Sequence, residues 1–188
     1  LLVSLEPMVR EGLLPRASLK APRSLGRGPT DYAAARAFKF PRFAEAFEMW
    51  KRKGGLRSAA FRAFERHTRG WLPGWCLFAS ATLGGPREQH AFVQFQFERQ
   101  WKALREHCHR KGVLLIGDLP IFVTLDSADV ADRPELFRLE RNGRPRVVTG
   151  VPPDCFSKDG QLWGHPHYAW AAHRREGFRW WTSRVATA

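Results

Sequence analysis

Four side chains suited to gripping a sugar lie within one Gly- and Pro-bounded loop: Asp154, Phe156, Gln161 and Trp163. Carboxylate and amide groups can bond to vicinal sugar hydroxyls in pairs, because a hydroxyl both donates and accepts. Phenyl and indole rings offer apolar area to the face of a pyranose. Together the four side chains are suited to a carbohydrate clamp. The alternative is that Asp154 shapes a turn and Trp163 fills the core, and the loop composition alone does not separate the two.

Asp118 interrupts an apolar run that extends from Val113 to Ile116 and resumes from Ile121 to Val123. A run of this kind, rich in β-branched residues and bounded by Gly and Pro, is typical of a strand buried on both faces. A buried carboxylate needs a partner or has a function. We therefore expect either a binding residue at the carboxyl end of a parallel strand or an Asp that is satisfied by backbone N–H groups.

Other motifs that carry chemistry are weak. His165, His167 and His173 invite a metal interpretation, but no Cys or acidic residue lies at ligand spacing and Pro166 separates the first two. Cys155 has no feature that would activate a thiol. The sequence contains no phosphate-binding glycine motif. We expect no metal and no cofactor.

The bulk composition limits the class of protein. With 188 residues, 44% of them hydrophobic, the chain can bury one core, and its eight Trp and fourteen Phe indicate a large aromatic core or exposed aromatic platforms. The net charge of +13 raises nucleic acid as a partner. The basic residues are scattered rather than gathered on one face, so we expect no nucleic acid and keep a basic nucleic-acid module as a rival.

The cysteines and the termini bear on location. Cys76, Cys108 and Cys155 are odd in number and widely spaced, which favours a reducing cytoplasm over a disulfide framework. No stretch predicts a membrane span or a signal peptide. The chain begins with Leu1 rather than Met, and we expect it to be a fragment.

The elements that must position these residues are mainly helices. Apolar spacing predicts a helix from about Pro41 to Gly54, another from Ser58 to His67, and a long one over 88–111. The long helix carries an apolar stripe typical of a core-facing helix, made by Phe97, Trp101, Leu104 and Cys108. It leads directly into the predicted strand at Val113, which is half of a βαβ unit and favours an α/β protein with a parallel sheet. Further on, Asn142-Gly143 predicts a hairpin turn.

The longer motifs resemble a known family. The runs IGDLPIFVTLDSADV, RPELFRL, NGRPRVVTGVPPDCFSKDGQLWGHPHYAW and GFRWW are closely similar to 4-α-glucanotransferases, also called amylomaltases or disproportionating enzymes. FKFPRFAEAFEMW and FVQFQFERQWKALREH are similar to the helices that precede them in that family. The resemblance covers nearly the whole chain and is most specific from Gly112 to Trp181.

The resemblance implies a fold class: α/β, a partial (β/α)8 TIM barrel of the α-amylase-like type with helical and lid-bearing insertions. It implies one partial catalytic-barrel domain over residues 1–188. Within it we expect a helical insertion over 1–87, a barrel helix and strand over 88–125, an inserted subdomain with a lid loop over 126–168, and the start of the next barrel helix over 169–188.

The resemblance also implies the transfer of α-1,4-glucan segments between maltooligosaccharides with retention, which requires two carboxyl groups about 5–5.5 Å apart. In the family these carboxyl groups come from later strands, so we expect no catalytic residue here and no activity of the chain alone. The substrate contacts implied are Asp118 at the cleavage site, Asp154, Gln161 and Trp163 on the acceptor side, and Phe156 on the lid.

Some positions depart from the family pattern. Cys155, His165 and Ala131 stand where members usually have Tyr, Asn and Trp, and the first two lie in the lid loop. A glucan-binding module without chemistry remains a second rival interpretation. The partners we expect are α-1,4-glucans and maltooligosaccharides, with no membrane and with the oligomeric state open.

Overall fold

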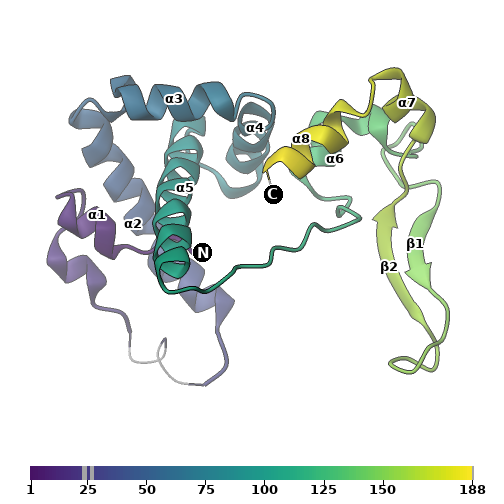
Figure 1. The fold of residues 1–188 in the computed structure, drawn as a ribbon, viewed down its shortest axis with the longest axis horizontal. Helices are drawn as coiled ribbons and strands as arrows, with labels where there is room; N and C mark the ends of the chain where they lie inside the picture. Colours follow the sequence, from purple (N-terminus) through teal and green to yellow (C-terminus); the bar gives the residue numbers. More distant parts are fainter. Residues whose placement is uncertain (23–24, 26–27, 188) are drawn as a thin grey trace. The chain divides into compact units, whose positions relative to one another are not determined.

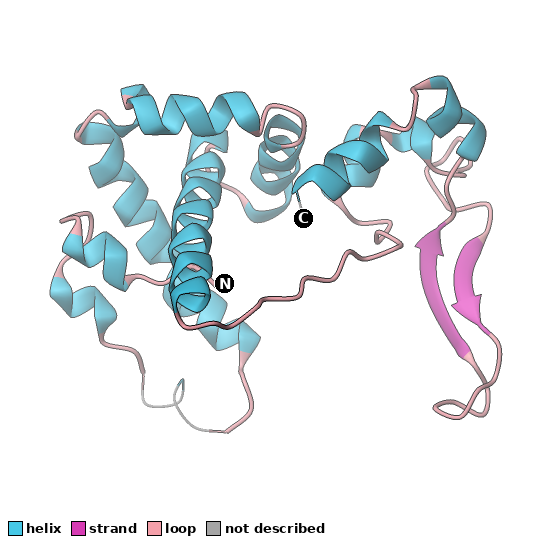
Figure 2. Cartoon of the chain, viewed as in Figure 1, coloured by secondary structure: helices cyan, strands magenta, loops and turns pink. Residues whose placement is uncertain are grey.

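The computed structural model describes residues 1–22, 25 and 28–187. The chain forms two compact units (Figure 1). The first contains Leu1–Leu72 and Ser80–Leu115, and the second contains Pro73–Ala79 and Ile116–Ala188. The first unit is helical, and the only strands in the described ranges lie in the second (Figure 2).

The first unit is built on α2 (Tyr32–Arg52), α3 (Ala59–His67) and α5 (Arg87–Arg110), with the short α1 (Glu6–Arg10) beside them. α4 (Leu72–Leu83) belongs partly to each unit. Two 3-10 turns, Arg16–Leu19 and Gly55–Arg57, complete this unit.

The helix predicted from about Pro41 begins nine residues earlier, so its predicted start is wrong. The carboxylate of Asp31 accepts a hydrogen bond from Ala34 N at 2.9 Å, which caps the helix. An alanine-rich first turn favours continuation, and Pro41 is tolerated inside α2. Ser58, in contrast, caps α3 as the sequence indicates, because its hydroxyl accepts from Phe61 N at 3.2 Å.

The core of the first unit is aromatic. The ring of Trp50 lies 4.9 Å, centroid to centroid, from both Phe61 and Phe92, and Phe61 lies 5.5 Å from Phe95. These contacts join α2, α3 and α5 through rings that are almost fully buried. Rings of this size each bury a large apolar area and so contribute strongly to the core.

The long predicted helix is confirmed as α5, but the expectation that its apolar stripe faces the core is wrong. The residues of α5 that are buried are Ala91, Phe92, Phe95 and Gln96. The side chains of Phe97, Trp101 and Leu104 are 36%, 40% and 48% exposed. α2 and α3 pack on the face that carries Phe92 and Phe95, and this packing decides which face is buried.

The predicted buried strand is not formed in this structure. Residues 113–125 are extended but form no strand (Figure 2). Leu114, Ile116 and Ile121 are 84%, 97% and 70% exposed. A strand buried on both faces requires neighbouring strands and two covering layers. Among the described residues the one sheet has two antiparallel strands, so the parallel sheet predicted for this segment is not formed.

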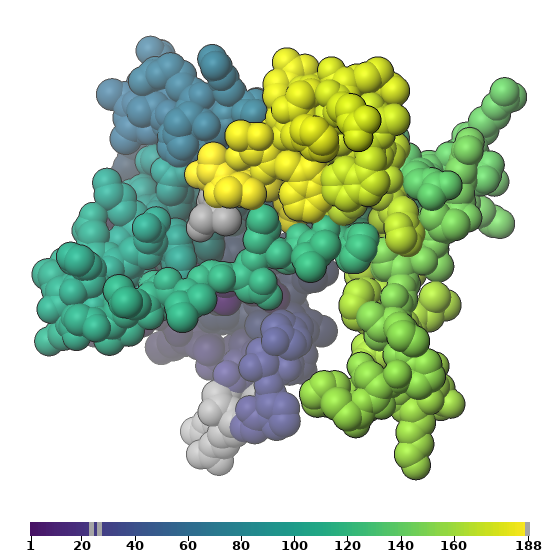
Figure 3. All heavy atoms as spheres, turned by 45° about the vertical axis from the view of Figure 1, so that its right-hand side comes forward, coloured from purple at the N-terminus to yellow at the C-terminus, as the bar shows by residue number. Residues whose placement is uncertain are grey.

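The second unit carries a projecting hairpin (Figure 3). Its strands are β1 (Val148–Val151) and β2 (Gln161–Pro166), with Val151 opposite Gln161. We call residues 148–166 the hairpin arm. The turn predicted at Asn142-Gly143 is confirmed just before it: Gly143 has φ 80°, and Glu140 N donates to Arg144 O at 2.7 Å.

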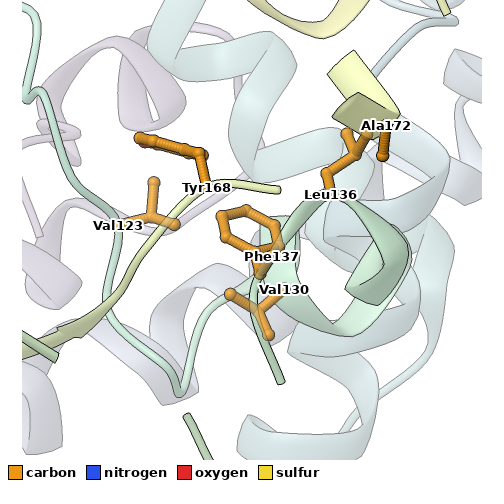
Figure 4. Packing of buried hydrophobic residues seen from close by; sticks show 6 residues of the cluster. All are labelled: Val123, Val130, Leu136, Phe137, Tyr168 and Ala172. Atoms are coloured by element: carbon orange, nitrogen blue, oxygen red, sulfur yellow. The ribbon is translucent and has the colours of Figure 1, made fainter. Parts of the chain in front are cut away.

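The arm rises from a small core made by residues of α6 (Ala128–Asp132), α7 (Trp170–Arg175) and the segments around them. Figure 4 shows its buried members: Val123, Val130, Leu136, Phe137, Tyr168 and Ala172. Trp180 and Trp181 of α8 (Arg179–Thr187) pack against this cluster. In the part of the chain that the structure describes, no helix combines the length and the apolar character needed to cross a membrane.

Candidate functional site

The loop of the hairpin arm is organised by Asp154. Its Oδ1 atom accepts hydrogen bonds from Phe156 N and Ser157 N, each at 2.8 Å. Asp154 N in turn donates to Ser157 O at 3.0 Å, and the Ser157 hydroxyl donates to Gly160 O at 2.7 Å. A side chain that bonds to the backbone two and three residues later is a turn-forming Asx motif. The interpretation of Asp154 as a turn residue is confirmed.

Gln161 and Trp163 are brought together on β2. Residues two apart on a strand share one face, and Trp163 Nε1 donates to Gln161 Oε1 at 3.1 Å. Trp163 is 44% exposed, so the alternative that it fills the core is wrong. This bond fixes the indole beside the amide oxygen of Gln161. The amide nitrogen of Gln161 takes no part in the bond. An oriented ring with an adjacent donor is suited to a flat polar ligand such as a sugar.

Phe156 lies on the loop of the same arm, and its side chain is 89% exposed. Cys155 beside it is exposed as well. Gly160 closes the loop at φ 70°, where a Cβ atom would stand 2.4 Å from Val151 O. This close approach requires glycine and brings the start of β2 back against the end of β1.

Asp118 lies on a different segment of the same unit, residues 116–124, which we call the Asp118 segment. The carboxylate is exposed, so the alternative of a buried Asp satisfied by backbone groups is wrong. Two side chains hold the backbone of this segment by hydrogen bonds. The Tyr168 hydroxyl donates to Ile121 O at 2.7 Å, and Arg184 Nη2 donates to Pro120 O at 3.0 Å.

The structure therefore gathers four of the five predicted contacts on one hairpin and leaves Asp118 on a separate, anchored segment. Sequence reasoning did not single out Tyr168 or Arg184. The one available signal was a hydroxyl among apolar positions near the end of the loop motif, since a buried Tyr hydroxyl needs a partner. Burial raises the pKa of Tyr168, which keeps its hydroxyl protonated as a donor.

Ion pairs link Arg133 to two glutamates in the second unit. Arg133 binds Glu135 at 2.5 Å and Glu176 at 2.8 Å. Burial alone would raise the pKa of Glu176, but hydrogen bonds from Arg133 and from Trp180 N lower it below its usual value. His173 is fully buried, and its Nε2 atom lies 3.1 Å from Leu136 O. These groups stabilise the core that supports the arm.

Over the described ranges, no three side chains of His, Cys, Asp or Glu are grouped as metal ligands. His173 lies in an aromatic cage instead, with the rings of Tyr168 and Trp170 each 5.4 Å from its own.

Comparison with known proteins shows which family the chain is similar to. A family model described as 4-alpha-glucanotransferase matches residues 81–188. A 4-alpha-glucanotransferase from Thermus thermophilus is 36% identical over 217 residues, an alignment that covers 100% of this chain and 43% of the relative. One from Aquifex aeolicus is 53% identical over 96 residues, covering 51% of this chain and 20% of the relative.

A solved structure is also similar. The amylomaltase from Streptococcus agalactiae in complex with acarbose matches with a TM-score of 0.75 and 30% identity, over 99% of this chain and 43% of that one. This chain thus spans less than half the length of the relatives it matches. The matched family region contains all five predicted contact residues, Asp118 to Trp163.

Proposed function

We propose a function from one premise: this chain belongs to the 4-alpha-glucanotransferase family. Enzymes of this family transfer α-1,4-glucan segments between maltooligosaccharides. Because the chain spans 43% of the Thermus thermophilus relative, we propose that its 188 residues supply the glucan-holding part of such an enzyme. The observation that carries this proposal is the family match over 81–188, which contains the hairpin arm and the Asp118 segment.

We propose the hairpin arm as the acceptor-side clamp. Trp163 and Gln161 would contact one sugar ring, because the indole is exposed and its orientation is fixed by the 3.1 Å bond to the amide. Phe156 would close over the glucan from the lid loop, since its ring is exposed and free of core contacts in that position. Asp154 would act in two ways: Oδ1 holds the loop, and its remaining oxygen would accept from a sugar hydroxyl.

Asp118 would contact the glucose at the cleavage site. Its exposure and the two bonds that anchor its segment support this role. Retaining transfer needs two carboxyl groups about 5–5.5 Å apart, and we assign neither of them to a residue of this chain. The substrates we propose are α-1,4-glucans. The acarbose bound to the related amylomaltase supports this substrate class.

We also propose a place for the chain within a barrel. α5 and the extended segment after it would form one helix and one strand of a (β/α)8 barrel. The apolar stripe of α5 and the exposed side chains of Leu114 and Ile116 support this, because a barrel would cover both. Residues 1–87 would be a helical insertion, 126–168 the lid-bearing subdomain and 169–188 the start of the next barrel helix. The cytoplasm is the proposed location, supported by the odd and widely spaced cysteines.

Incubation of the purified chain with maltotriose tests the proposed division of labour. We expect no glucose and no longer oligomers by chromatography, while calorimetry detects binding of maltoheptaose. Appearance of maltotetraose and longer products would show that the chain holds a complete catalytic site. Absence of any maltoheptaose binding would refute the glucan-holding role.

A binding-only module makes the same two predictions, so a third observation must separate it. The coding sequence beyond codon 188 does this. A continuing reading frame that supplies further carboxylates supports the enzyme, and a stop codon there supports the module.

A further inference from the structure

Two side chains hold the backbone immediately after Asp118. The Tyr168 hydroxyl donates to Ile121 O at 2.7 Å and Arg184 Nη2 donates to Pro120 O at 3.0 Å. Both acceptors are main-chain carbonyls on consecutive residues, within three residues of Asp118. Two bonds to consecutive peptide groups restrict both the position and the rotation of a segment that has no strand pairing of its own.

Tyr168 is itself fixed. It is 4% exposed, and its ring is stacked on Phe122 with centroids 5.9 Å apart and planes 12° apart. It also packs on Phe137 at 5.5 Å and on Trp181 at 5.0 Å. Figure 4 shows Tyr168 beside Val123 and Phe137. The hydroxyl therefore has a defined position from which to donate.

Arg184 is held by aromatic faces. Its guanidinium carbon lies 4.6 Å from the ring centroid of Trp180 and 5.5 Å from that of Trp181. A guanidinium that rests on indole rings loses little further freedom when it donates to a carbonyl. The two donors thus come from one aromatic cluster that contains Tyr168, Trp180 and Trp181.

The same cluster forms the base of the hairpin arm. β2 ends at Pro166, and the next residues pair with the segment after α6. Arg138 N donates to His167 O at 2.8 Å, Ala169 N donates to Leu136 O at 2.8 Å, and Phe137 lies opposite Tyr168 in an antiparallel bridge. Tyr168 therefore lies two residues beyond the end of β2, in an isolated bridge at the base of the arm, while its hydroxyl reaches the Asp118 segment.

We propose that Tyr168 and Arg184 are positioning residues of the glucan site: they fix Asp118 relative to the base of the hairpin arm, so that Asp118 and Trp163 hold one glucan chain together. This proposal rests on the glucan-holding function proposed above. It assigns a task to two residues that are not proposed to contact the sugar themselves.

The first test measures the order of the Asp118 segment without any ligand. Backbone ¹⁵N relaxation of the chain should give rigid order parameters, about 0.8 or higher, for residues 118–122. In Tyr168→Phe, which keeps the packed ring, and in Arg184→Met, which keeps the stem, we expect these values to fall toward about 0.6. The order parameters of β1 and β2 should stay unchanged.

The matched control is Tyr32→Phe. Tyr32 is the other of the chain's two tyrosines, is 69% exposed, and lies in the first unit. It should leave residues 118–122 as rigid as in the parent. Equal order parameters in the parent and in Tyr168→Phe would overturn the proposal, and so would a parent segment that is already mobile.

The second test asks whether Tyr168 acts through Asp118. Affinity for maltoheptaose is measured for Tyr168→Phe, Asp118→Ala and the double variant. We expect Tyr168→Phe to weaken binding about 5- to 10-fold in the parent, the value of one hydrogen bond, and to have no further effect when Asp118 is absent. A general loss of structure would instead weaken binding equally in both backgrounds, and that result would overturn the proposal.

Each of the two tests can fail without the other. Absence of maltoheptaose binding to the parent would count against the proposed function, and the relaxation experiment would still decide whether the two donors fix the segment. A mobile segment in Tyr168→Phe together with unchanged glucan affinity would overturn the positioning role while leaving the glucan-holding function in place.

Discussion

Substitution of Asp154 separates its two proposed roles. Asp154→Ala removes Oδ1 and with it the two 2.8 Å bonds from Phe156 N and Ser157 N. Asp154→Asn keeps a side-chain oxygen that can accept both bonds but removes the charge, and Asn supports the same Asx turn. The pair of variants therefore distinguishes a residue that only shapes the loop from one that also binds sugar.

The expected loss of loop stability in Asp154→Ala follows from these contacts. Each hydrogen bond contributes about 0.5–1.5 kcal/mol net, so loss of both should destabilise the loop by about 1–3 kcal/mol, with amide exchange at Phe156 and Ser157 about 5- to 150-fold faster. Because Asp154 is exposed, the midpoint of global unfolding should move little. Hydrogen exchange by NMR measures the first effect and thermal denaturation the second.

Calorimetry with maltoheptaose completes the comparison. If Asp154 also accepts from a sugar hydroxyl, Asp154→Asn should bind about 10-fold more weakly while its loop amides exchange as in the parent. Parent-like affinity of Asp154→Asn would refute direct sugar contact and leave only the turn. Unchanged amide exchange in Asp154→Ala would refute the account of the loop itself.

Three further predictions concern stability. Phe92→Ala, at a fully buried ring between α2 and α5, should lower the free energy of unfolding by about 3–5 kcal/mol, whereas Phe97→Ala, one third exposed on the same helix, should cost far less in the same urea titration. Gly160→Ala should disorder the arm, because its Cβ would meet Val151 O at φ 70°; retention of the β1–β2 cross-strand NOEs would contradict this. The pKa of Glu176 is lowered in the folded state. Its ion pair therefore stabilises the protein fully at pH values above the ordinary carboxyl pKa, and this stabilisation is lost as the pH falls through the pKa of the folded state. Glu176→Gln should therefore lower the unfolding free energy by about 1 kcal/mol at neutral pH and by much less in acid, and an equal effect at both pH values would refute it.

Local signals in the sequence predicted much of the secondary structure. Ser58 ahead of an apolar pattern marked the start of α3, and Asn142-Gly143 marked a turn, because caps and tight turns depend on nearby residues. The start of α2 was missed because Pro is typical of a first helical turn, whereas the Asp31 cap and the alanine-rich turn after it begin the helix nine residues earlier and leave Pro41 inside. Local patterns report what a segment can form, and neighbouring elements decide where it begins.

Burial was harder to predict because it depends on partners distant in the sequence. Phe92 and Phe95 are buried in α5, and Trp101 is exposed, because α2 and α3 cover one face. The apolar run after α5 has the composition of a buried strand, but strand formation requires partner strands. Because no strand pairs with this segment in the described chain, Leu114 and Ile116 stay exposed.

The candidate site stays a prediction in its sugar contacts, and only its local geometry can be compared with the sequence. Residue types in one loop indicated a sugar clamp, and the structure placed Gln161 against Trp163. The anchoring of the Asp118 segment by Tyr168 and Arg184 could not be read from spacing, because hydrogen bonds to main-chain carbonyls leave no pattern in the sequence.

The glucan-holding role is tested most directly by calorimetric titration with maltoheptaose of the parent chain, Trp163→Ala and Trp101→Ala. The two indoles are similarly exposed, at 44% and 40%, and Trp101 lies on α5, outside the proposed site. Covering about 60 Å² of the Trp163 ring at about 25 cal/mol per Å² is worth about 1.5 kcal/mol, roughly tenfold in affinity. We expect Trp163→Ala to lose that factor and Trp101→Ala to bind as the parent does. Equal affinities in all three proteins, or loss in Trp101→Ala alone, would contradict the assignment of the hairpin arm as the glucan clamp.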